Sequence, residues 1–548
     1  MKKKILVILL LTVSVSVHSQ WIASFGGTES DNNISDAKGQ SLAVDDNNFS
    51  YVTGYIYEAT GNNNIILIKY SHSGDTVWTR TYNGNAGLND KGMDVCTDNE
   101  GNVYVTGFAQ FEGKGNDAVV LKYSTDGTLL WVKQFSSASI SADDAGTTIT
   151  VDDSRNVYVT GYTTSSDGFT DIFVMKIAPS GEVLWTKTED GQFHFNAAGN
   201  GIAVSGTGTI YVTGYFSSSA SNSNIAVVKY NSAGNLEWSK EINGEGNNED
   251  NAWGIVVDDV DIVYVTGYTT ALLNNIDCYT ASFNSAGTLL WSKTFNGSGN
   301  QTDKAWGIVV DSDRSVYITG QTTSNNSNTD FLTIKYSSNG AIQWNSVYNG
   351  TGNQEDVSIG IDLLPNENNL VVTGKSWGTS NNFDFATVKY NSGNGTQSQV
   401  NRYSISSNTQ DIPTDIKSSK NGHVIVTGYG VNIAGVNETD SYISTLSLNW
   451  GSELISEPEI PAEFSLEQNY PNPFNPVTNI KFTLPDDVNV KLAVYDVMGR
   501  IVDVLANQKL EAGVHTISFN ATNLPSGIYF CKLEAGNYNA VRKMSLIK

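Results

Sequence analysis

The sequence predicts an all-β chain in which a ring of four-stranded sheets, a β-propeller, precedes a small β-sandwich. Three observations support this prediction: an internal repeat of 53 or 54 residues, short β-branched and aromatic runs separated by turn residues, and a change of pattern near residue 451. A chain of 548 residues is long for one ordinary domain, but a repeat explains such a length.

A Thr-Gly pair ends an apolar run once in every repeat. The pairs begin at Thr53, Thr106, Thr160, Thr213, Thr266, Thr319, Thr373 and Thr427. A tryptophan keeps the same spacing, at Trp78, Trp131, Trp185, Trp238, Trp291 and Trp344. Each repeat holds four short runs rich in Val, Ile, Tyr and Thr, as expected for strands, between gaps rich in Asn, Gly, Ser and Asp. Four antiparallel strands per repeat are typical of a propeller blade.

The two ends of the repeat region predict that the ring closes. The last repeat stops after the run Asp440–Leu448 without a tryptophan strand, whereas the first repeat is preceded by an extra one, Trp21–Phe25. Pairing of these two strands would leave no open sheet edge. We therefore expect eight blades, with the tryptophan strand outermost in each.

One repeat reads DKAWGIVVD (303–311) followed by VYITG (316–320), and it resembles the SBBP bacterial β-propeller repeat. The resemblance covers residues 20–450. The family name implies seven blades, so a seven-bladed ring with a distorted last repeat is the alternative. That last repeat departs from the pattern, with Gln397 at the expected tryptophan position and Thr445-Leu446 at the expected Lys-Tyr position.

Residues 1–19 are predicted to be a signal peptide. Three lysines precede the apolar run Ile5–Val17, and Ser19 stands at the expected cleavage position before Gln20. The run is too short to cross a membrane, and no later apolar segment approaches the required length. We expect an exported chain without a transmembrane segment.

The C-terminal part differs from the repeats. Residues 451–464 (GSELISEPEIPAEF) predict a linker, and residues 465–548 predict a small β-sandwich. The segments LEQNYPNPFNP (466–476), YDVMGR (495–500), LPSGIY (524–529) and KMSLIK (543–548) resemble the type A sorting domain of type IX secretion. The resemblance implies a Gram-negative bacterium, the type IX machinery as partner, and a secreted or surface-attached product. A carbohydrate-binding sandwich is the alternative.

Charge and cysteine content exclude several classes of protein. The formal charge of −24 argues against nucleic acid and against anionic membranes as partners. Cys96, Cys278 and Cys531 are widely separated, which predicts small buried side chains rather than disulfides or a metal site.

An aspartate stands three residues before the position of Trp306 in six repeats. These are Asp90, Asp144, Asp250, Asp303, Asp356 and Asp411. Each precedes an innermost strand, so we expect a partial ring of carboxylates around one mouth of the central channel. Such a ring could bind calcium or a polyol. The alternative, which we favour, is that each carboxylate accepts backbone N–H bonds from its own turn or the next blade. We accordingly expect no metal or other cofactor.

The position of Trp306 itself varies between repeats. It is occupied by Gln40, Met93, Thr147, Asn200, Trp253, Trp306, Ile359 and Thr414. Trp253 and Trp306 lie in neighbouring repeats, and Trp377 lies in the loop after the next Thr-Gly pair. We predict that these three, with Asp250, Asp303 and Asp356, bind a glycan or a protein. Packing between blades is the alternative role for the tryptophans.

Catalytic signals are weak. The chain has no HExxH, GxSxG, P-loop or dinucleotide-binding motif, and His194 is the one histidine that replaces the acidic residues before an innermost strand. We therefore expect a non-enzymatic binding or adhesion module on the cell surface. The alternatives are a polysaccharide lyase or hydrolase that uses Asp and His194 at the channel mouth, and a structural surface component.

Overall fold

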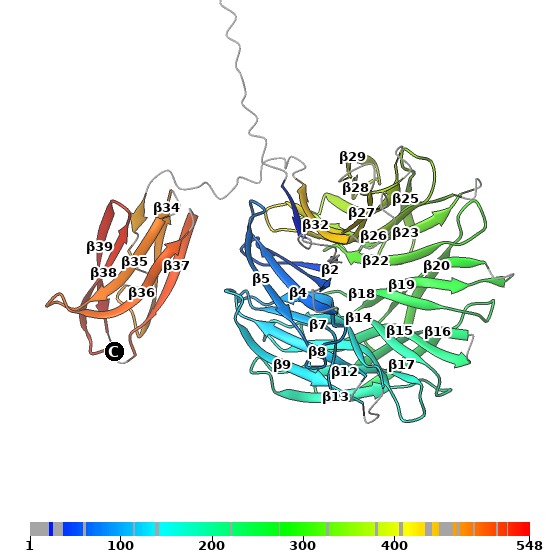
Figure 1. Ribbon diagram of the computed structural model, residues 1–548, viewed down its shortest axis with the longest axis horizontal. Helices are drawn as coiled ribbons and strands as arrows, with labels where there is room; N and C mark the ends of the chain where they lie inside the picture. The colour runs from blue at the N-terminus through cyan, green and yellow to red at the C-terminus, as the bar shows by residue number, and fades with distance from the viewer. Residues whose placement is uncertain are drawn as a thin grey trace, which may run out of the picture. The chain divides into compact units, whose positions relative to one another are not determined.

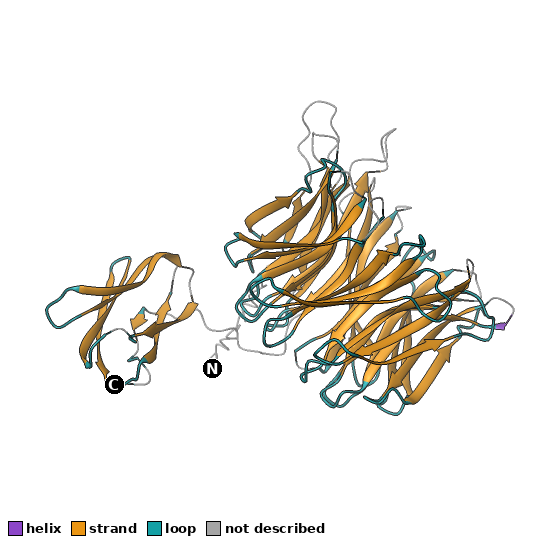
Figure 2. Ribbon diagram, turned by 90° about the horizontal axis from the view of Figure 1, so that it is seen from below, coloured by secondary structure: helices purple, strands orange, loops and turns teal. Residues whose placement is uncertain are grey.

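The computed structural model describes residues 21–25, 37–57, 62–112, 115–137, 142–219, 222–272, 275–324, 328–365, 367–378, 382–404, 409–432, 441–448, 464–466, 468–469, 472–485, 488–510, 513–522 and 524–547. The chain divides into two compact units between Gly451 and Ser452. The predicted signal peptide (1–19) and residues 451–463 of the predicted linker lie outside the described residues. Both units consist of strands joined by loops (Figure 2). Within the described ranges, no helix has the length and apolar character needed to cross a membrane.

The described part of the first unit contains eight four-stranded antiparallel sheets, and seven of them use four consecutive strands. The first three are β2 (Ala37–Val44), β3 (Ser50–Tyr57), β4 (Asn63–Tyr70) and β5 (Thr76–Tyr82); β6 (Lys91–Thr97), β7 (Val103–Gln110), β8 (Asn116–Tyr123) and β9 (Leu129–Phe135); and β10 (Ala145–Val151), β11 (Val157–Thr164), β12 (Thr170–Ile177) and β13 (Val183–Glu189). The next two are β14 (Ala197–Val204), β15 (Ile210–Ser219), β16 (Asn222–Tyr230) and β17 (Leu236–Ile242); and β18 (Asn251–Val257), β19 (Val263–Thr270), β20 (Ile276–Phe283) and β21 (Leu289–Phe295). The last two are β22 (Lys304–Val310), β23 (Val316–Thr323), β24 (Thr329–Tyr336) and β25 (Ile342–Tyr348); and β26 (Asp356–Leu363), β27 (Asn369–Trp377), β28 (Phe383–Asn391) and β29 (Gln397–Tyr403).

The eighth sheet joins the two ends of the repeat region. It contains β30 (Thr409–Ser418), β31 (Val424–Asn432) and β32 (Ser441–Leu448), and its fourth strand is β1 (Ile22–Phe25). Strand β1 pairs antiparallel with β32, with Ile22 opposite Leu446 and Phe25 opposite Ile443. The pairing of the first and last strands that the sequence predicts is therefore present.

The first strand of each sheet contacts the first strands of its neighbours. These contacts run in chain order from β2 through β6, β10, β14, β18, β22 and β26 to β30, and β30 contacts β2. In Figure 1, the first strands β2, β14, β18 and β22 are near the middle of the unit, and the fourth strands β5, β9, β13 and β17 are at its periphery. Apolar side chains of neighbouring sheets share buried clusters, as Tyr51 and Val105 do. We call the side at which each first strand begins and each second strand ends the upper face.

The tryptophans recur because each one bonds the next sheet. In seven sheets, an indole N–H donates to a carbonyl oxygen in the turn between the third and fourth strands of the following sheet. The pairs are Trp21–His72, Trp78–Thr125, Trp131–Pro179, Trp185–Ser232, Trp238–Ser285, Trp291–Ser338 and Trp344–Ser392. A glycine in the same turn faces the ring: a Cβ on Gly340, whose φ is +80°, would lie 2.6 Å from Trp291. Tryptophan and turn glycine therefore recur together.

The sheet β26–β29 lacks this tryptophan. Gln399 stands opposite Lys389, as Trp344 stands opposite Lys335, so Gln399 occupies the tryptophan position and the prediction of Gln397 is wrong. Part of the reason is the pairing at this turn: Tyr390 pairs with Gln397, whereas Tyr336 pairs with Ile342, so the turn between the paired residues is one residue longer. The sheet that follows takes its third and fourth strands from the two ends of the repeat region. No turn joins those strands, so the turn carbonyl oxygen that the other tryptophans bond has no counterpart there.

The Lys-Tyr position of the last repeat is also displaced from the prediction. Val424 pairs with Leu448 in this sheet, as Val316 pairs with Tyr336 in an earlier one. Ser447-Leu448 therefore occupies the position that the sequence spacing assigns to Thr445-Leu446.

The Thr-Gly pairs recur because both residues are required where the second strand passes a β-bulge of the first. The Thr319 hydroxyl donates to the Leu332 carbonyl oxygen of the third strand at 3.0 Å. The following Gly320 stands opposite Ala305, next to the bulge, and a Cβ on it would lie 1.9 Å from the Lys304 carbonyl oxygen. Only glycine allows this close approach.

The second unit contains two sheets that share one hydrophobic core. Its strands are β33 (Ser465–Leu466), β34 (Val477–Leu484), β35 (Val488–Tyr495), β36 (Ile501–Leu510), β37 (Gly513–Asn520), β38 (Gly527–Ala535) and β39 (Tyr538–Leu546). The sheet orders are β33-β34-β37 and β36-β35-β38-β39. Phe482 and Phe519 of the first sheet and Leu492 and Leu533 of the second lie in the same buried cluster. Cys531 also lies in it, and burial raises the pKa of its thiol to about 12.

Candidate functional site

The six aspartates predicted to ring a channel mouth are fully buried. They are Asp90, Asp144, Asp250, Asp303, Asp356 and Asp411. None of the six carboxylates is therefore exposed at a channel mouth. The physical reason is that most of these carboxylates hold the loop before the first strand.

Asp250 shows the arrangement. Its carboxylate accepts N–H bonds from Gly244, in the loop before β18, and from Thr270, at the end of β19, both at 2.6 Å. Burial raises the pKa of Asp250 to about 6, the two N–H bonds oppose this rise, and the neighbouring Glu249 adds to it. The carboxylate thus ties the loop to the upper end of the second strand, as the hydrogen-bonding alternative predicts.

Asp303 and Asp356 repeat these contacts in the next two sheets. Asp303 accepts from Gly297 at 2.7 Å and from Thr323 at 2.9 Å. Asp356 accepts from Gly350 at 2.6 Å and from Trp377 at 3.0 Å. All three predicted ligand-binding aspartates therefore position loops of the upper face.

Trp253 and Trp306 are the extra residues of β-bulges. Trp253 interrupts the pairing between Ala252 and Gly254, and Trp306 interrupts it between Ala305 and Gly307. Both tryptophans are half-buried. The variable position is the bulge residue in every first strand, occupied by Gln40, Met93, Thr147, Asn200, Trp253, Trp306, Ile359 and Thr414. A bulge releases its extra residue from the ladder and redirects its side chain, so this position can vary without disturbing the sheet.

The structure brings the strands of Trp253 and Trp306 together, but Trp377 packs within its own sheet. A Cβ on Gly254, next to Trp253, would lie 2.7 Å from the Trp306 carbonyl oxygen. Trp377 is half-buried, and its ring meets that of Phe383 edge to face at a centroid distance of 4.7 Å. Trp253 and Trp306 are therefore the aromatic pair of the candidate site.

Three residues that the sequence did not single out complete this part of the upper face. The ring of Tyr268 lies 5.4 Å from that of Trp253, and its hydroxyl donates to Glu249 at 2.7 Å. Lys304 Nζ lies 4.1 Å from the centroid of the Tyr268 ring. Burial lowers the pKa of Lys304, and Glu249 opposes this effect. Aromatic faces, an ammonium and a carboxylate thus meet across the boundary between two sheets.

A repeated sequence signal points to Tyr268. An aromatic residue directly follows the Thr-Gly pair in six of the eight repeats: Tyr55, Phe108, Tyr162, Tyr215, Tyr268 and Tyr429. These aromatic residues lie near the upper ends of the second strands, close to the start of the first strands that pair with them.

His194 lies apart from these residues, in the loop between β13 and β14. Its φ is 55° and its Nδ1 contacts a carboxylate oxygen of Asp190. This contact raises the pKa of His194, with smaller contributions from Asp167 and Asp171. Burial, with the negative charges of Asp190 and Asp167, raises the pKa of Asp171 to about 6. The histidine thus belongs to a small acidic cluster.

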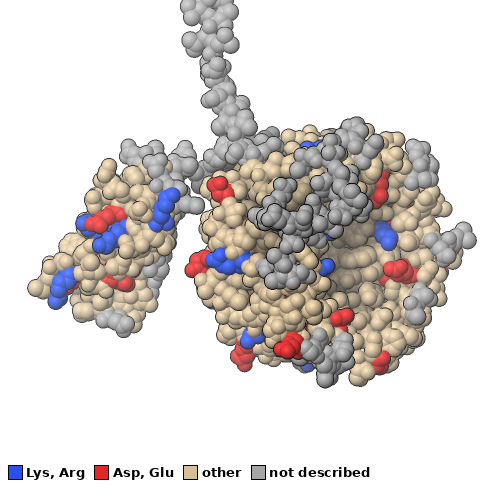
Figure 3. Space-filling model, viewed as in Figure 1, with Lys and Arg blue, Asp and Glu red and all other residues tan. Residues whose placement is uncertain are grey.

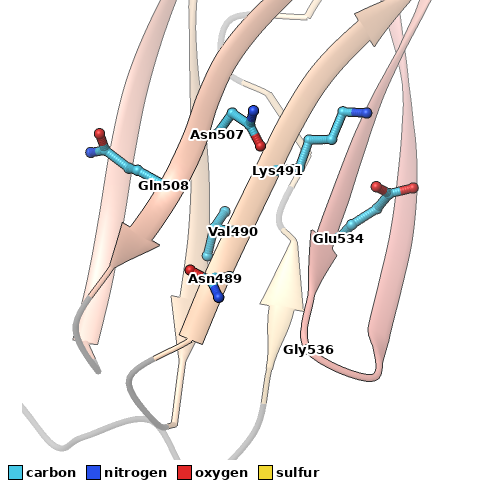
Figure 4. Close-up of a pocket in the computed structure, with 7 residues that line it drawn as sticks. All are labelled: Asn489, Val490, Lys491, Asn507, Gln508, Glu534 and Gly536. Carbon is cyan, nitrogen blue, oxygen red and sulfur yellow. The ribbon is translucent and has the colours of Figure 1, made fainter.

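The charged side chains and surface hollows described next do not form a second candidate site among the described residues. The face drawn in Figure 3 is hollowed near the middle of the first unit, and charged side chains stand at its margin. In the second unit, a shallow hollow is lined by polar groups of β35, β36 and β38, among them Lys491, Asn507 and Glu534 (Figure 4). Across the residues that the structure describes, no cluster of three or more His, Cys, Asp or Glu side chains is arranged to hold a metal ion.

Comparisons with known proteins match segments of both units. Residues 468–548 match the secretion system C-terminal sorting domain. Residues 130–169 match a β-propeller repeat, and residues 206–237 match a β-propeller domain of unknown function. No curated protein matches the chain.

Several solved structures are similar to the chain at low identity. The WD40 domain of SCAP from fission yeast is 11% identical, with 78% of this chain and 98% of that chain covered and a TM-score of 0.42. PorZ, a surface component of the type-IX secretion system of Porphyromonas gingivalis, is 11% identical, with 93% and 81% covered and a TM-score of 0.25. A Bacteroides caccae protein of unknown function is 14% identical, with 54% and 94% covered and a TM-score of 0.31. These scores are too low to assign a fold or a function.

The sorting domain implies an interaction with the type IX secretion machinery. The chain therefore contains a β-propeller repeat of the SBBP type and ends in a type IX sorting domain, which indicates secretion to the cell surface or the extracellular space.

Proposed function

We propose that residues 20–450 form an eight-bladed β-propeller closed by β1, and that residues 465–548 form a small β-sandwich. The eight four-stranded sheets, the contact of β30 with β2 and the pairing of β1 with β32 support the closed ring. The bond from Trp21 to His72 supports it further, because this bond repeats across the closure the contact that links the other sheets. The shared core of the two C-terminal sheets supports the sandwich.

We propose that this propeller is a non-enzymatic binding module that holds an extracellular glycan or protein on its upper face. One observation carries the proposal: Trp253 and Trp306 are half-buried, lie on neighbouring first strands, and sit at bulges where the sheet does not need them. Tyr268 and Lys304 add an aromatic face and an ammonium beside them. Tryptophan faces next to polar groups are suited to sugar rings and to peptide side chains.

A glycan array probed with the mature chain tests this function. We expect saturable binding that Trp306→Ala and Trp253→Ala each weaken about fivefold or more, since stacking on an aromatic face contributes about 1 kcal/mol or more. Thr147→Ser is the control, because Thr147 is the bulge residue of β10, a strand that carries none of the candidate residues. Melting temperatures report folding. Lost stability with unchanged binding would show that the tryptophans only pack between blades, and absence of any saturable ligand would favour a structural surface role.

The contact between His194 and Asp190 supports a second candidate, a secreted polysaccharide lyase or hydrolase. A histidine with a raised pKa beside Asp171, whose pKa is about 6, could exchange a proton near neutral pH. Release of oligosaccharide from a polymer that the chain binds, lost on His194→Gln, would establish the enzyme. Unchanged polymer length would leave the binding function.

We propose that the chain needs no metal ion. The six buried aspartates support this, since those in the three sheets with the tryptophans already hold backbone N–H groups. The melting temperature of the chain with a chelator should equal that with added calcium. A higher melting temperature with calcium would instead support a cation site.

A further inference from the structure

Two sets of lysines in the first unit have different surroundings. One set lies in the third strands, where each ammonium donates to a carbonyl oxygen of the next sheet. Its bonds are Lys69–Thr125, Lys122–Pro179, Lys176–Ser232, Lys229–Ser285 and Lys335–Ser392. These carbonyl oxygens belong to the same turns that the tryptophans bond. This set therefore serves the packing between sheets.

The second set lies at the start of the first strands, on the upper face. Lys38 in β2, Lys91 in β6 and Lys304 in β22 each reach over an aromatic ring in the second strand of the preceding sheet. The distances from Nζ to the ring centroid are 4.9 Å for Lys38, 4.7 Å for Lys91 and 4.1 Å for Lys304. All three are half-buried and so keep part of their surface accessible to solvent.

No carboxylate of the described residues forms an ion pair with any of these three lysines. Lys375, the lysine that directly follows a Thr-Gly pair, behaves differently, because its Nζ contacts Glu355 at 2.6 Å. An aromatic face holds an ammonium in place without neutralising it. Glu249 acts on Lys304 through its charge but forms no ion pair with it. In a chain of net charge −24, three ammonium groups without ion-paired carboxylates on one face form a local site for negative charge.

Lys304 also connects this set to the candidate aromatic site. It is two residues from Trp306 in β22, and it shares Tyr268 with Trp253. Lys38 and Lys91 lie in the first strands β2 and β6, which contact each other. Because β22 contacts β26, β26 contacts β30, and β30 contacts β2, the lysines stand on an arc of consecutive first strands.

We propose that the upper face binds an acidic polysaccharide, with sugar rings against Trp253 and Trp306 and carboxylates against Lys38, Lys91 and Lys304. This inference rests on the proposed binding function and names its ligand class. A neutral glycan would leave all three ammonium groups without an ion-pair partner, whereas an acidic protein would not require the aromatic pair. A polymer that carries both ring faces and carboxylates uses both groups of residues.

Two polymers with the same backbone test the inference: polygalacturonate, and the same polymer with its carboxylates methyl-esterified. We expect the full mature chain to bind polygalacturonate at least tenfold more tightly than the ester, and added salt to weaken only the binding of polygalacturonate. The variant Lys38→Gln/Lys91→Gln/Lys304→Gln should lose about tenfold or more in affinity for polygalacturonate and little for the ester.

A control of equal charge change is Lys187→Gln/Lys240→Gln/Lys293→Gln, on the outer strands β13, β17 and β21. It should bind as the unaltered chain does. An equal loss in both triple variants would mean that net charge, and not the upper face, attracts the polymer, and would overturn the inference. So would equal binding of polygalacturonate and its ester, or binding of poly-glutamate as tight as that of polygalacturonate. If neither galacturonate polymer binds but Trp306→Ala abolishes binding of a neutral glycan, the binding function stands and the acidic ligand is wrong.

Discussion

Asp330 and Asp384 occupy the same position in neighbouring sheets, the second residue of the third strand, but they meet different surroundings. Asp384 forms an ion pair with Arg402, with Oδ2 of Asp384 at 2.8 Å from Nη2 of Arg402. Asp330 is 3% exposed, and within the described residues its Oδ1 has no hydrogen-bond partner. Burial, together with the negative charge of Asp356, raises the pKa of Asp330 to about 6. One repeated position therefore carries a paired charge in one sheet and an unpaired charge in the next.

The two positions should respond oppositely to removal of the charge. Because the pKa of Asp330 is higher in the folded state, its contribution to the free energy of unfolding is full below about pH 4 and is lost as the pH rises through about 6. Asp330→Asn should therefore stabilise the first unit at pH 7 and have little effect at pH 4. Asp384→Asn should destabilise it at pH 7, because Arg402 loses its partner. Urea unfolding at the two pH values measures both, and a loss of stability in Asp330→Asn at pH 7 would contradict the assignment.

At the scale of the strand, the β-bulge explains both what repeats and what varies. The residue opposite the bulge must be glycine, which is why Gly320 and its counterparts follow the threonines without exception. The bulge residue itself is unconstrained, so the same strand position holds Trp306 in one sheet and Thr414 in another. A position that accepts only glycine and a position that accepts many residue types thus lie next to each other on neighbouring strands.

Gly320→Ala should damage the strand pair that carries Lys304 and Trp306. A Cβ there would lie 1.9 Å from a backbone oxygen that cannot move aside, so we expect a loss of about 3 kcal/mol or more in the free energy of unfolding. Gly206→Ala is the control, since nothing lies within 4 Å of a Cβ there, and it should change stability by less than about 0.5 kcal/mol. Equal effects of the two substitutions in chemical denaturation would refute this account of the Thr-Gly pairs.

At the scale of the whole molecule, the two units differ in charge as well as in pattern. Residues 465–548 contain eight Lys or Arg and seven Asp or Glu, a net charge of +1, so the remainder of the chain carries −25. The sorting unit is thus nearly neutral, and the acidity of the protein belongs to the repeats. Within the repeats, β1 joins the beginning of the chain to its end and covers the edge of β32.

Trp21→Ala should weaken this closure specifically. Trp21 is 8% exposed, donates to the His72 carbonyl oxygen at 2.9 Å and packs against Tyr70. We expect a loss of about 3–5 kcal/mol of stability, with β32 becoming the fastest-exchanging strand as β1 detaches. Hydrogen–deuterium exchange of residues 441–448 measures this. Trp291→Ala removes the equivalent contact within the ring and should leave β32 protected; equal exchange of β32 in both variants would show that β1 does not hold the closure.

Agreement between the sequence and the structure depends on the range of the interaction concerned. The strand predicted at Leu289–Phe295 has those bounds, because its alternation and its turn residues are local signals. The position of Gln399 could not be found by counting, because the longer turn before it changes the register, which only pairing with Lys389 reveals. Likewise, the sequence left the aspartates two chemically reasonable roles, and only the structure shows that all six are buried.

The sequence by itself determined the four-stranded repeat, the meeting of the first and last strands, and the identity of the C-terminal sorting domain. Periodic residues and local motifs carry all three, since each blade must satisfy the same contacts with the next. The tertiary structure decided which polar groups form hydrogen bonds within the fold and which remain accessible to a ligand. Two lysine columns look alike in the sequence, but the ammonium groups of one donate to carbonyl oxygens of the next sheet, and those of the other lie over aromatic rings of the preceding sheet. That difference arises between strands of neighbouring sheets, where no local pattern records it.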